Sequence, residues 1–415
     1  MAGSTLAFIL VLSACGAGTP TTPTTTAPRP TSTTIVFSPE PSAPAPSGEP
    51  PPPPTLEVTE IQRNLEVPWD LAFTPDGRMI VTERPGRVRV FESAEPYAPR
   101  LFGLAIPEAY ADGEAGARGV TVDREFDEFP FAYVCVSRDA DGPDGPEPWR
   151  NELLRLRVAE DSTLTIDGPP LVTGIKAAVN HNGCAVEMDT ENHIWMSVGE
   201  ANTVRNRNLA QDPTSLNGKI LRINRDGSIP EDNPIMPGTS APSAVWSMGH
   251  RNPQGIAMRA DGLVLAPEHG TDRDDEINAI EPGGNYGYGC YIGFSFVGPA
   301  QEQEGEAKDA CGPAEDYLEP LWASGMPTLA TSNATFLTGS QWGGWEGDLI
   351  VSTLKEADLR RFEVSDDGTQ IEMVETLFDQ EYGRLRATVM GPDGALYITT
   401  AKGTSDRIFR VVAGD

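Results

Sequence analysis

Short runs in which apolar and polar residues alternate recur along the chain from Val58 onward. In the first pair of runs, residues 71–73 and 79–81 flank Asp76-Gly77, a dipeptide typical of a tight hairpin turn. Five similar pairs follow, at residues 119–122 and 131–134, 184–188 and 193–196, 255–258 and 263–265, 334–337 and 348–351, and 387–390 and 396–399. The pattern therefore predicts six antiparallel hairpins.

Many of these hairpins are followed by another strand-like run, at residues 87–91, 153–158, 220–223, 359–362 and 408–412. Six repeats over about 360 residues leave about 60 residues for each repeat. This spacing favours an all-β fold, a six-bladed β-propeller of four-stranded antiparallel blades. A large β-sandwich is the alternative, but its strands need not repeat. We expect residues 58–61 to pair with the last strand near Val411 and so close the ring.

The N-terminal part has a different composition. Residues 6–11 form a short apolar run, and Leu12-Ser13-Ala14-Cys15 resembles the processing site of a bacterial lipoprotein. We therefore predict a signal peptide at residues 1–15 with lipidation at Cys15, a disordered Thr/Pro-rich stalk at residues 16–56, and the propeller at residues 57–415. A plain secretory signal is the alternative. Both signals imply export, and a lipid anchor would hold the protein on the outer face of the cell membrane.

The chain is strongly acidic. Of its 415 residues, 61 are Asp or Glu and 31 are Lys or Arg, which gives a formal net charge of −30. Because like charges repel, nucleic acid and anionic lipid surfaces are unsuitable partners. The protein is therefore expected to touch the membrane only through its N-terminal anchor.

Apart from Cys15, the chain contains four cysteines: Cys135, Cys184, Cys290 and Cys311. Four cysteines in an exported chain suggest two disulfides. Pairing of Cys290 with Cys311 would close a long acidic loop and leave Cys135 to pair with Cys184. The sequence alone allows three connectivities.

The segment from Arg251-Asn252 to Asn278 combines two kinds of polar group. Its second half, residues 268–278, is rich in carboxylates and contains a glycine, and oxygen ligands of this kind suit Ca²⁺. A guanidinium close by suits an anionic ligand. Together they predict a site that holds a polyanionic cofactor through a cation and arginines.

Several longer motifs carry a family resemblance. Residues 69–78, 81–87, 249–255, 274–278 and 283–287 are similar to the glucose/sorbosone dehydrogenase family, the soluble quinoprotein aldose sugar dehydrogenases. The resemblance covers residues 57–412. It implies a six-bladed propeller that binds pyrroloquinoline quinone (PQQ) and Ca²⁺ and oxidises the anomeric carbon of an aldose to a lactone.

The resemblance also implies a role for individual residues. His181 matches the general base that takes the sugar hydroxyl proton, and Glu114 matches a position that contacts the sugar. The matches to cofactor-binding positions are Arg251, Asn252, Lys355, Arg384 and Arg386. The carbonyls of Gly270 and Thr271 match ligands of the cofactor Ca²⁺, and Glu276 and the Tyr286 carbonyl match a second, structural Ca²⁺ site.

The chemistry of these residues agrees with the implied cofactor. PQQ carries three carboxylates, for which the predicted set offers four cationic side chains, and a histidine can remove the proton. His250 is expected to support the Arg251 loop. One departure from the family concerns the residues after His181. Gly183 is followed here by Cys184-Ala185, where the family usually has a second glycine and an arginine.

Two other functions remain open at this point. The same propeller could be a non-catalytic envelope lipoprotein with a degenerate quinone site, because a fold does not define a function. It could also be a lactonase-type hydrolase with a central Ca²⁺. The sequence names neither the sugar nor the electron acceptor.

Overall fold

The computed structural model describes residues 54–139, 149–202, 209–290 and 316–414. The predicted signal peptide, Cys15 and nearly all of the predicted stalk lie outside these ranges, as does Cys311. The described residues belong to one compact unit. Within the residues that the structure describes, no helix has the length and apolar composition needed to cross a bilayer.

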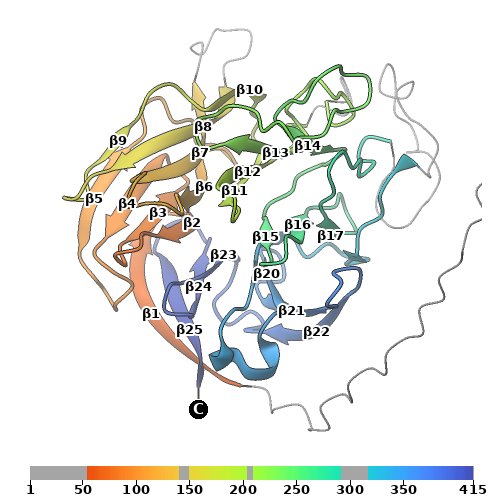
Figure 1. Cartoon of the computed structure of the whole chain (residues 1–415). Coiled ribbons are helices and arrows are strands. Elements are labelled where there is room, and N and C mark those ends of the chain that lie inside the picture. The colour runs from red at the N-terminus through yellow and green to blue at the C-terminus, as the bar shows by residue number, and fades with distance from the viewer. Residues whose placement is uncertain (1–53, 140–148, 203–208, 291–315, 415) are drawn as a thin grey trace, which may run out of the picture. The chain divides into compact units, whose positions relative to one another are not determined.

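Six antiparallel sheets follow one another around a ring (Figure 1). Blade 1 contains β2 (Pro68–Phe73), β3 (Met79–Glu83), β4 (Arg87–Phe91) and β5 (Arg100–Ala105). Blade 2 contains β6 (Ala117–Val122), β7 (Phe131–Asp139), β8 (Trp149–Val158) and β10 (Val172–Lys176), with the short β9 (Leu164–Ile166) beside β8. Blade 3 contains β11 (Gly183–Met188), β12 (His193–Val198), β13 (Lys219–Asn224) and β14 (Val245–Met248).

Blades 4 to 6 complete the ring. Blade 4 contains β15 (Ala257–Met258), β16 (Val264–Glu268), β17 (Glu276–Ala279) and β18 (Trp322–Ala323). Blade 5 contains β19 (Thr331–Phe336), β20 (Leu349–Thr353), β21 (Leu359–Val364) and β22 (Ile371–Leu377). Blade 6 contains β23 (Leu385–Met390), β24 (Leu396–Thr400), β25 (Asp406–Gly414) and β1 (Thr55–Leu65). The predicted six-bladed propeller is confirmed, and blade 2 differs from the prediction only in its fifth strand.

The ring is closed by strands from the two ends of the folded unit. β1 pairs antiparallel with β25, and Val58 lies opposite Val411 in the register. This confirms the predicted closure. Backbone hydrogen bonds thus join the first and last strands, so that blade 6 has its full set of strands.

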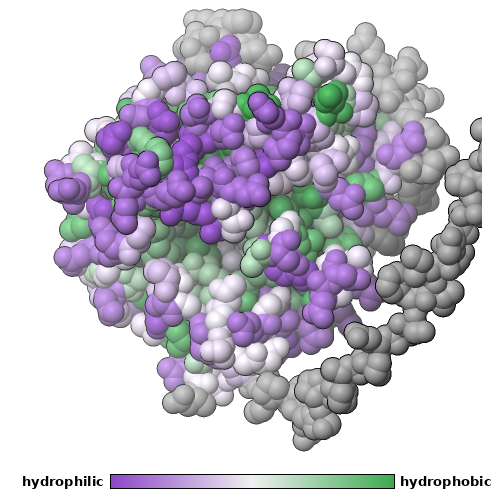
Figure 2. Space-filling view, in the orientation of Figure 1, coloured by the Kyte–Doolittle hydropathy of each residue, from purple (hydrophilic) through white to green (hydrophobic). Residues whose placement is uncertain are grey.

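The hydrophobic core is divided among the interfaces between neighbouring blades. One cluster joins blades 1 and 2 and a second joins blades 2 and 3, and corresponding clusters follow around the ring. On the face that Figure 2 shows, hydrophilic residues gather in the upper left part of the view, and hydrophobic residues are visible around its centre. Because apolar burial holds the blades side by side, the loops at their ends are left to carry polar chemistry.

The structure also decides between the possible disulfide connectivities. Cys135 on β7 is bonded to Cys184 on β11, with 5.8 Å between their Cα atoms. Cys290 is disulfide-bonded as well, but its predicted partner Cys311 lies outside the described ranges. The first bond joins blade 2 to blade 3.

Candidate active site

His181 lies in a tight turn that immediately precedes β11. The backbone has positive φ at His181 (60°), Gly183 (61°) and Cys184 (80°). The buried side chain of Asn182 holds the turn, because its Oδ1 accepts a hydrogen bond from Ala178 N at 3.0 Å and its Nδ2 donates to Ala178 O at 2.6 Å. The hydrogen bonds of the Asn182 side chain therefore hold the backbone of the turn, and this backbone positions the His181 side chain.

Glu200 sets the orientation of the His181 ring. Its Oε1 lies 2.5 Å from His181 Nδ1, and its side chain is almost fully buried. The Glu200 amide donates to Arg251 O at 2.9 Å, and the Ala201 amide donates to His181 O at 2.9 Å. Because a carboxylate can only accept, the contact favours the tautomer with the proton on Nδ1, which leaves Nε2 as the atom able to accept a proton.

Glu114 lies beside this turn, in the loop between β5 and β6. Its carboxylate accepts hydrogen bonds from Asn182 N at 3.2 Å and from Asn252 Nδ2 at 3.2 Å. Burial alone would raise the pKa of Glu114, but the nearby His269 and His181 contribute to a net pKa below the usual value. Glu114 is therefore ionised at neutral pH.

A second buried carboxylate organises the Arg251 loop. Glu268, at the end of β16, accepts hydrogen bonds from the backbone amides of Arg251 and Asn252 and lies 2.9 Å from His250 Nδ1. His250 is fully buried and its ring stacks on Tyr286 at 4.6 Å between centroids. The structure thus places His250 as a support of this loop, as expected from the sequence.

Arg386 is the most deeply buried of the predicted cofactor-binding cations. Its guanidinium lies 3.5 Å from the centroid of the Trp69 ring, and its Nη1 donates to Gln254 Oε1 at 3.1 Å. Burial lowers the pKa of Arg386 to about 9, with a counteracting effect of Glu114 and a further lowering by Arg384. The cost of burying this cation is therefore only partly offset by the protein's own groups.

Positive groups outnumber carboxylates around Glu114. Glu114 interacts electrostatically with His269 and Arg386. His269 in turn interacts with Arg251. Arg386 interacts with three further arginines, which are Arg84, Arg118 and Arg384. Among the described residues, buried nitrogen atoms without a hydrogen-bond partner occur in this set on Arg84, Arg118, Arg251, Arg386 and His269. Buried donors of this kind normally have partners. The set therefore fits an anionic ligand with several acceptor oxygens.

Lys355 and Arg384 are exposed. Lys355 Nζ lies 3.4 Å from Thr328 Oγ1, and the preceding Leu354 belongs to the same apolar cluster as Trp69, whose ring is covered by Arg386. Within the described residues, none of Arg251, Lys355, Arg384 and Arg386 forms an ion pair with a carboxylate. These cations remain available to a ligand.

The four predicted metal-binding residues line one small pocket. Gly270, Thr271, Glu276 and Tyr286 all contribute to it, together with Glu268 and Asp274. Burial and the neighbouring Glu268 raise the pKa of Glu276 to about 8. The described residues contain no group of three or more His, Cys, Asp or Glu side chains placed to hold a metal. Backbone carbonyls, the kind of ligand predicted for Gly270, Thr271 and Tyr286, would contribute to the binding of a cation here.

Sequence reasoning missed several residues of this site. Glu200, Glu268 and His269 received no role, and Arg118 was not considered. One signal was present for two of them, because Glu200 is the second residue after β12 and His269 is the first residue after β16, and strand ends often carry site residues. Glu276, a match to a Ca²⁺ ligand, is the first residue of β17, a strand that the sequence analysis did not include.

The fold and the site together define a six-bladed propeller that holds a His–Glu pair next to several cations suited to an anionic ligand. The glucose/sorbosone dehydrogenase family matches residues 65–410. The chain therefore belongs to this family.

Individual relatives agree with this assignment. The chain is 29% identical to the aldose sugar dehydrogenase YliI of Escherichia coli over 365 residues, which cover 85% of this chain and 92% of the relative. A putative glucose dehydrogenase from Thermus thermophilus has a similar structure, with a TM-score of 0.70, 33% identity, and coverage of 86% of this chain and 100% of the other. The PQQ-bound aldose sugar dehydrogenase of Streptomyces coelicolor has a TM-score of 0.66 and 25% identity, with 87% and 99% coverage.

Proposed function

We propose that this protein is a PQQ- and Ca²⁺-dependent dehydrogenase that oxidises the anomeric carbon of an aldose sugar to the lactone. Family membership and the PQQ-bound structure of the Streptomyces relative support the type of cofactor. We also propose that the protein is exported and anchored through Cys15 on the outer face of the membrane, where an unidentified acceptor would take the electrons.

One observation carries this proposal. Buried arginine nitrogens without partners lie around an ionised carboxylate and a His–Glu pair, and a molecule with three carboxylates would supply the missing acceptors. Arg251, Arg384, Arg386 and Lys355 would hold the cofactor, with Asn252 beside them. The carbonyls of Gly270 and Thr271 would hold the Ca²⁺ at the cofactor, and Glu276 with the Tyr286 carbonyl would hold the structural Ca²⁺.

The residues of the chain would handle the proton. His181 Nε2 would accept the proton of the anomeric hydroxyl, while Glu200 keeps the Nδ1 proton in place and stabilises the imidazolium. Glu114, held by Asn182 and Asn252, would accept a hydrogen bond from another sugar hydroxyl. When bound, PQQ supplies the hydride acceptor, and Ca²⁺ supplies a Lewis acid that polarises its carbonyl.

The test is sugar-dependent reduction of a dye by the protein supplied with Ca²⁺ and PQQ, with identification of the lactone. We expect His181→Ala to lower kcat by at least about a hundredfold, because the proton acceptor is lost. His193→Gln, at a histidine that also has a carboxylate partner, is the matched control and should keep its activity. A folded protein that binds PQQ but is silent with every aldose would contradict the activity. Lactone hydrolysis without a quinone would instead indicate a hydrolase.

A further inference from the structure

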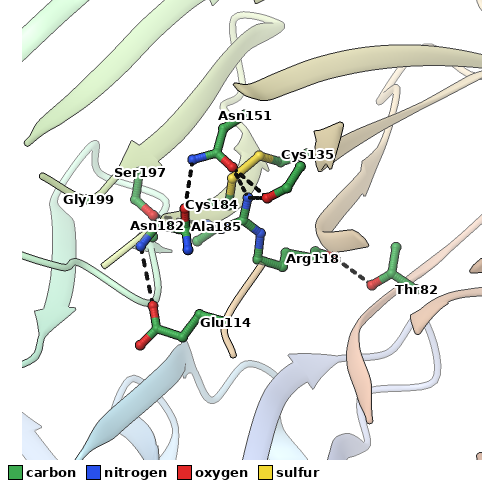
Figure 3. Close-up of a disulfide and its surroundings, with 12 residues drawn as sticks. Thr82, Glu114, Arg118, Cys135, Asn151, Asn182, Cys184, Ala185, Ser197 and Gly199 are labelled. Carbon is green, nitrogen blue, oxygen red and sulfur yellow. Dashed lines mark hydrogen bonds between the residues drawn. A yellow bond between two sulfur atoms is a disulfide. The ribbon is translucent and has the colours of Figure 1, made fainter. Parts of the chain in front are cut away.

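The Cys135–Cys184 disulfide lies beside Asn182, the residue that follows His181 in the turn (Figure 3). Cys184 is the third residue after His181, and Cys135 lies on the neighbouring blade. Both cysteines are fully buried. The covalent bond therefore connects blade 2 to the backbone that carries the proposed base.

The backbone of this turn adopts a conformation that Cys184 disfavours by itself. Cys184 has a φ of 80°, in the left-handed region that glycine adopts readily and other residues avoid. The turn also has little room to move. A Cβ atom at Gly183 would lie 2.8 Å from Gly199 N, and one at Gly119 on β6 would lie 2.3 Å from Cys184 O. Packing thus limits the turn, and a covalent bond at Cys184 adds a restraint at the residue whose φ is unfavourable.

A buried chain of hydrogen bonds connects the same two blades next to the disulfide (Figure 3). Arg118 Nη2 donates to Asn151 Oδ1 at 2.5 Å, and Asn151 Nδ2 donates to Asn182 Oδ1 at 3.2 Å. The backbone N–H of Asn182 donates to the carboxylate of Glu114. A shift of the turn would therefore disturb both His181 and the contact with Glu114.

We propose that the Cys135–Cys184 disulfide is a positioning element for His181: it holds Cys184 in the left-handed conformation and thereby keeps the imidazole against Glu200. The crosslink replaces the conformational freedom that a glycine would provide at position 184. The part of this inference that concerns turnover rests on the proposed function, whereas the part that concerns the position of His181 does not.

The decisive comparison uses two variants that both lack the crosslink. Cys135→Ala with Cys184→Ala leaves a side chain at the strained position, whereas Cys135→Ala with Cys184→Gly places there the residue that tolerates positive φ. The readout is the imidazole NMR spectrum of the protein without cofactor. The chain has only 4 histidines, and the spectrum of a His181→Gln variant identifies the His181 signal.

We expect the alanine variant to shift or broaden the His181 signal and the glycine variant to restore it to its wild-type position. A wild-type His181 signal in the folded alanine variant would overturn the proposal, and so would an equal loss in the glycine variant. The single variant Cys135→Ala, which leaves the Cys184 side chain in place as a thiol, makes the same comparison if the double alanine variant does not fold. Removal of the other two cysteines of the propeller, with Cys290→Ala and Cys311→Ala, is the matched control and should leave the His181 signal unchanged.

Turnover provides a second readout. With PQQ and Ca²⁺ bound, we expect kcat of the alanine variant to fall about tenfold, because small displacements of a catalytic group are costly. KM should change by less than about twofold, and the glycine variant should recover most of kcat. If the wild-type protein shows no sugar oxidation, the proposed function fails, but the NMR comparison still decides whether the disulfide positions His181. If the alanine variant has a lower unfolding midpoint but an unchanged kcat and an unchanged His181 signal, the disulfide only stabilises the fold and does not position His181.

Discussion

At the scale of single residues, the tautomer and the orientation of the His181 ring depend on one buried carboxylate. Glu200 Oε1 lies 2.5 Å from His181 Nδ1, which keeps the proton on that nitrogen. We predict that Glu200→Gln lowers kcat about 10- to 100-fold with little change in cofactor binding, because an amide neither fixes the tautomer nor stabilises the imidazolium. Dye-reduction kinetics measure the effect.

The matched control for this variant is Asp189→Asn. Asp189 Oδ2 lies 3.1 Å from His193 Nδ1 in another His–carboxylate pair, away from the residues of the site. Its substitution should leave kcat unchanged. An equal loss of kcat in the two variants would show that Glu200 acts through general stability.

A second residue-scale prediction concerns Glu187, a half-buried glutamate on β11. Burial and the nearby Asp70 raise the pKa of Glu187 to about 8. An unfolded glutamate titrates near pH ~4.3, so the folded state binds more protons between these values and its stability falls as the pH rises from about 4 to about 8. We predict that Glu187→Gln raises the free energy of unfolding at about pH 8 by about 2 kcal/mol, and by less at about pH 5.

Urea denaturation at several pH values measures this effect. The exposed Glu191, with 73% of its side chain accessible, provides the matched control as Glu191→Gln. A pH dependence that is identical in wild-type protein and Glu187→Gln would contradict the prediction.

The residues of the site could be assigned from the sequence only where a long motif carried them. Arg251 and Asn252 stand in such a motif, and the structure places Asn252 against Glu114. Glu200 has no comparable signal, because a glutamate after a strand is common and its distance from His181 depends on how two loops approach. Isolated acidic residues of this kind cannot be ranked without the fold.

At the scale of elements, the stability of the ring depends on β1. Ile61 is fully buried in the cluster between blades 6 and 1. We predict that Ile61→Ala lowers the free energy of unfolding by about 2–5 kcal/mol, because a buried side chain is replaced by a cavity. Thermal or urea unfolding provides the measurement.

The control lies on the same strand. Thr59 is exposed, and Thr59→Ala should change the free energy of unfolding by less than about 0.5 kcal/mol. If Ile61→Ala were no more destabilising than Thr59→Ala, the closing strand would contribute little to the fold.

Elements were predictable wherever alternation of apolar and polar residues was strong. The hairpin of β2 and β3 is an example, since Leu71 lies opposite Val81 in the observed register. β17 was missed because its residues follow an acidic run that is typical of a loop, although Glu276 pairs with Glu268 on β16. A strand of four residues provides too short a pattern to outweigh this local composition.

At the scale of the whole molecule, the propeller brings together residues that are far apart in the chain. Glu114, His181, Asn252 and Arg386 belong to different blades or to the loops between them, yet electrostatic interactions and hydrogen bonds connect them. Because acidic residues outnumber basic residues in this chain and give it a net charge of −30, a group of neighbouring cations is unexpected. Composition alone could not locate it, because the cations meet only when the ring closes.

The most direct test of the central claim is a calorimetric titration of the Ca²⁺-supplied protein with PQQ. We predict the uptake of one PQQ for each chain. Arg386→Gln should weaken binding at least about tenfold, because it removes a buried donor to a carboxylate. Arg360→Gln, at an arginine that pairs with Asp358 on blade 5, should bind as the wild type does. A folded wild-type protein that takes up no PQQ would contradict the account.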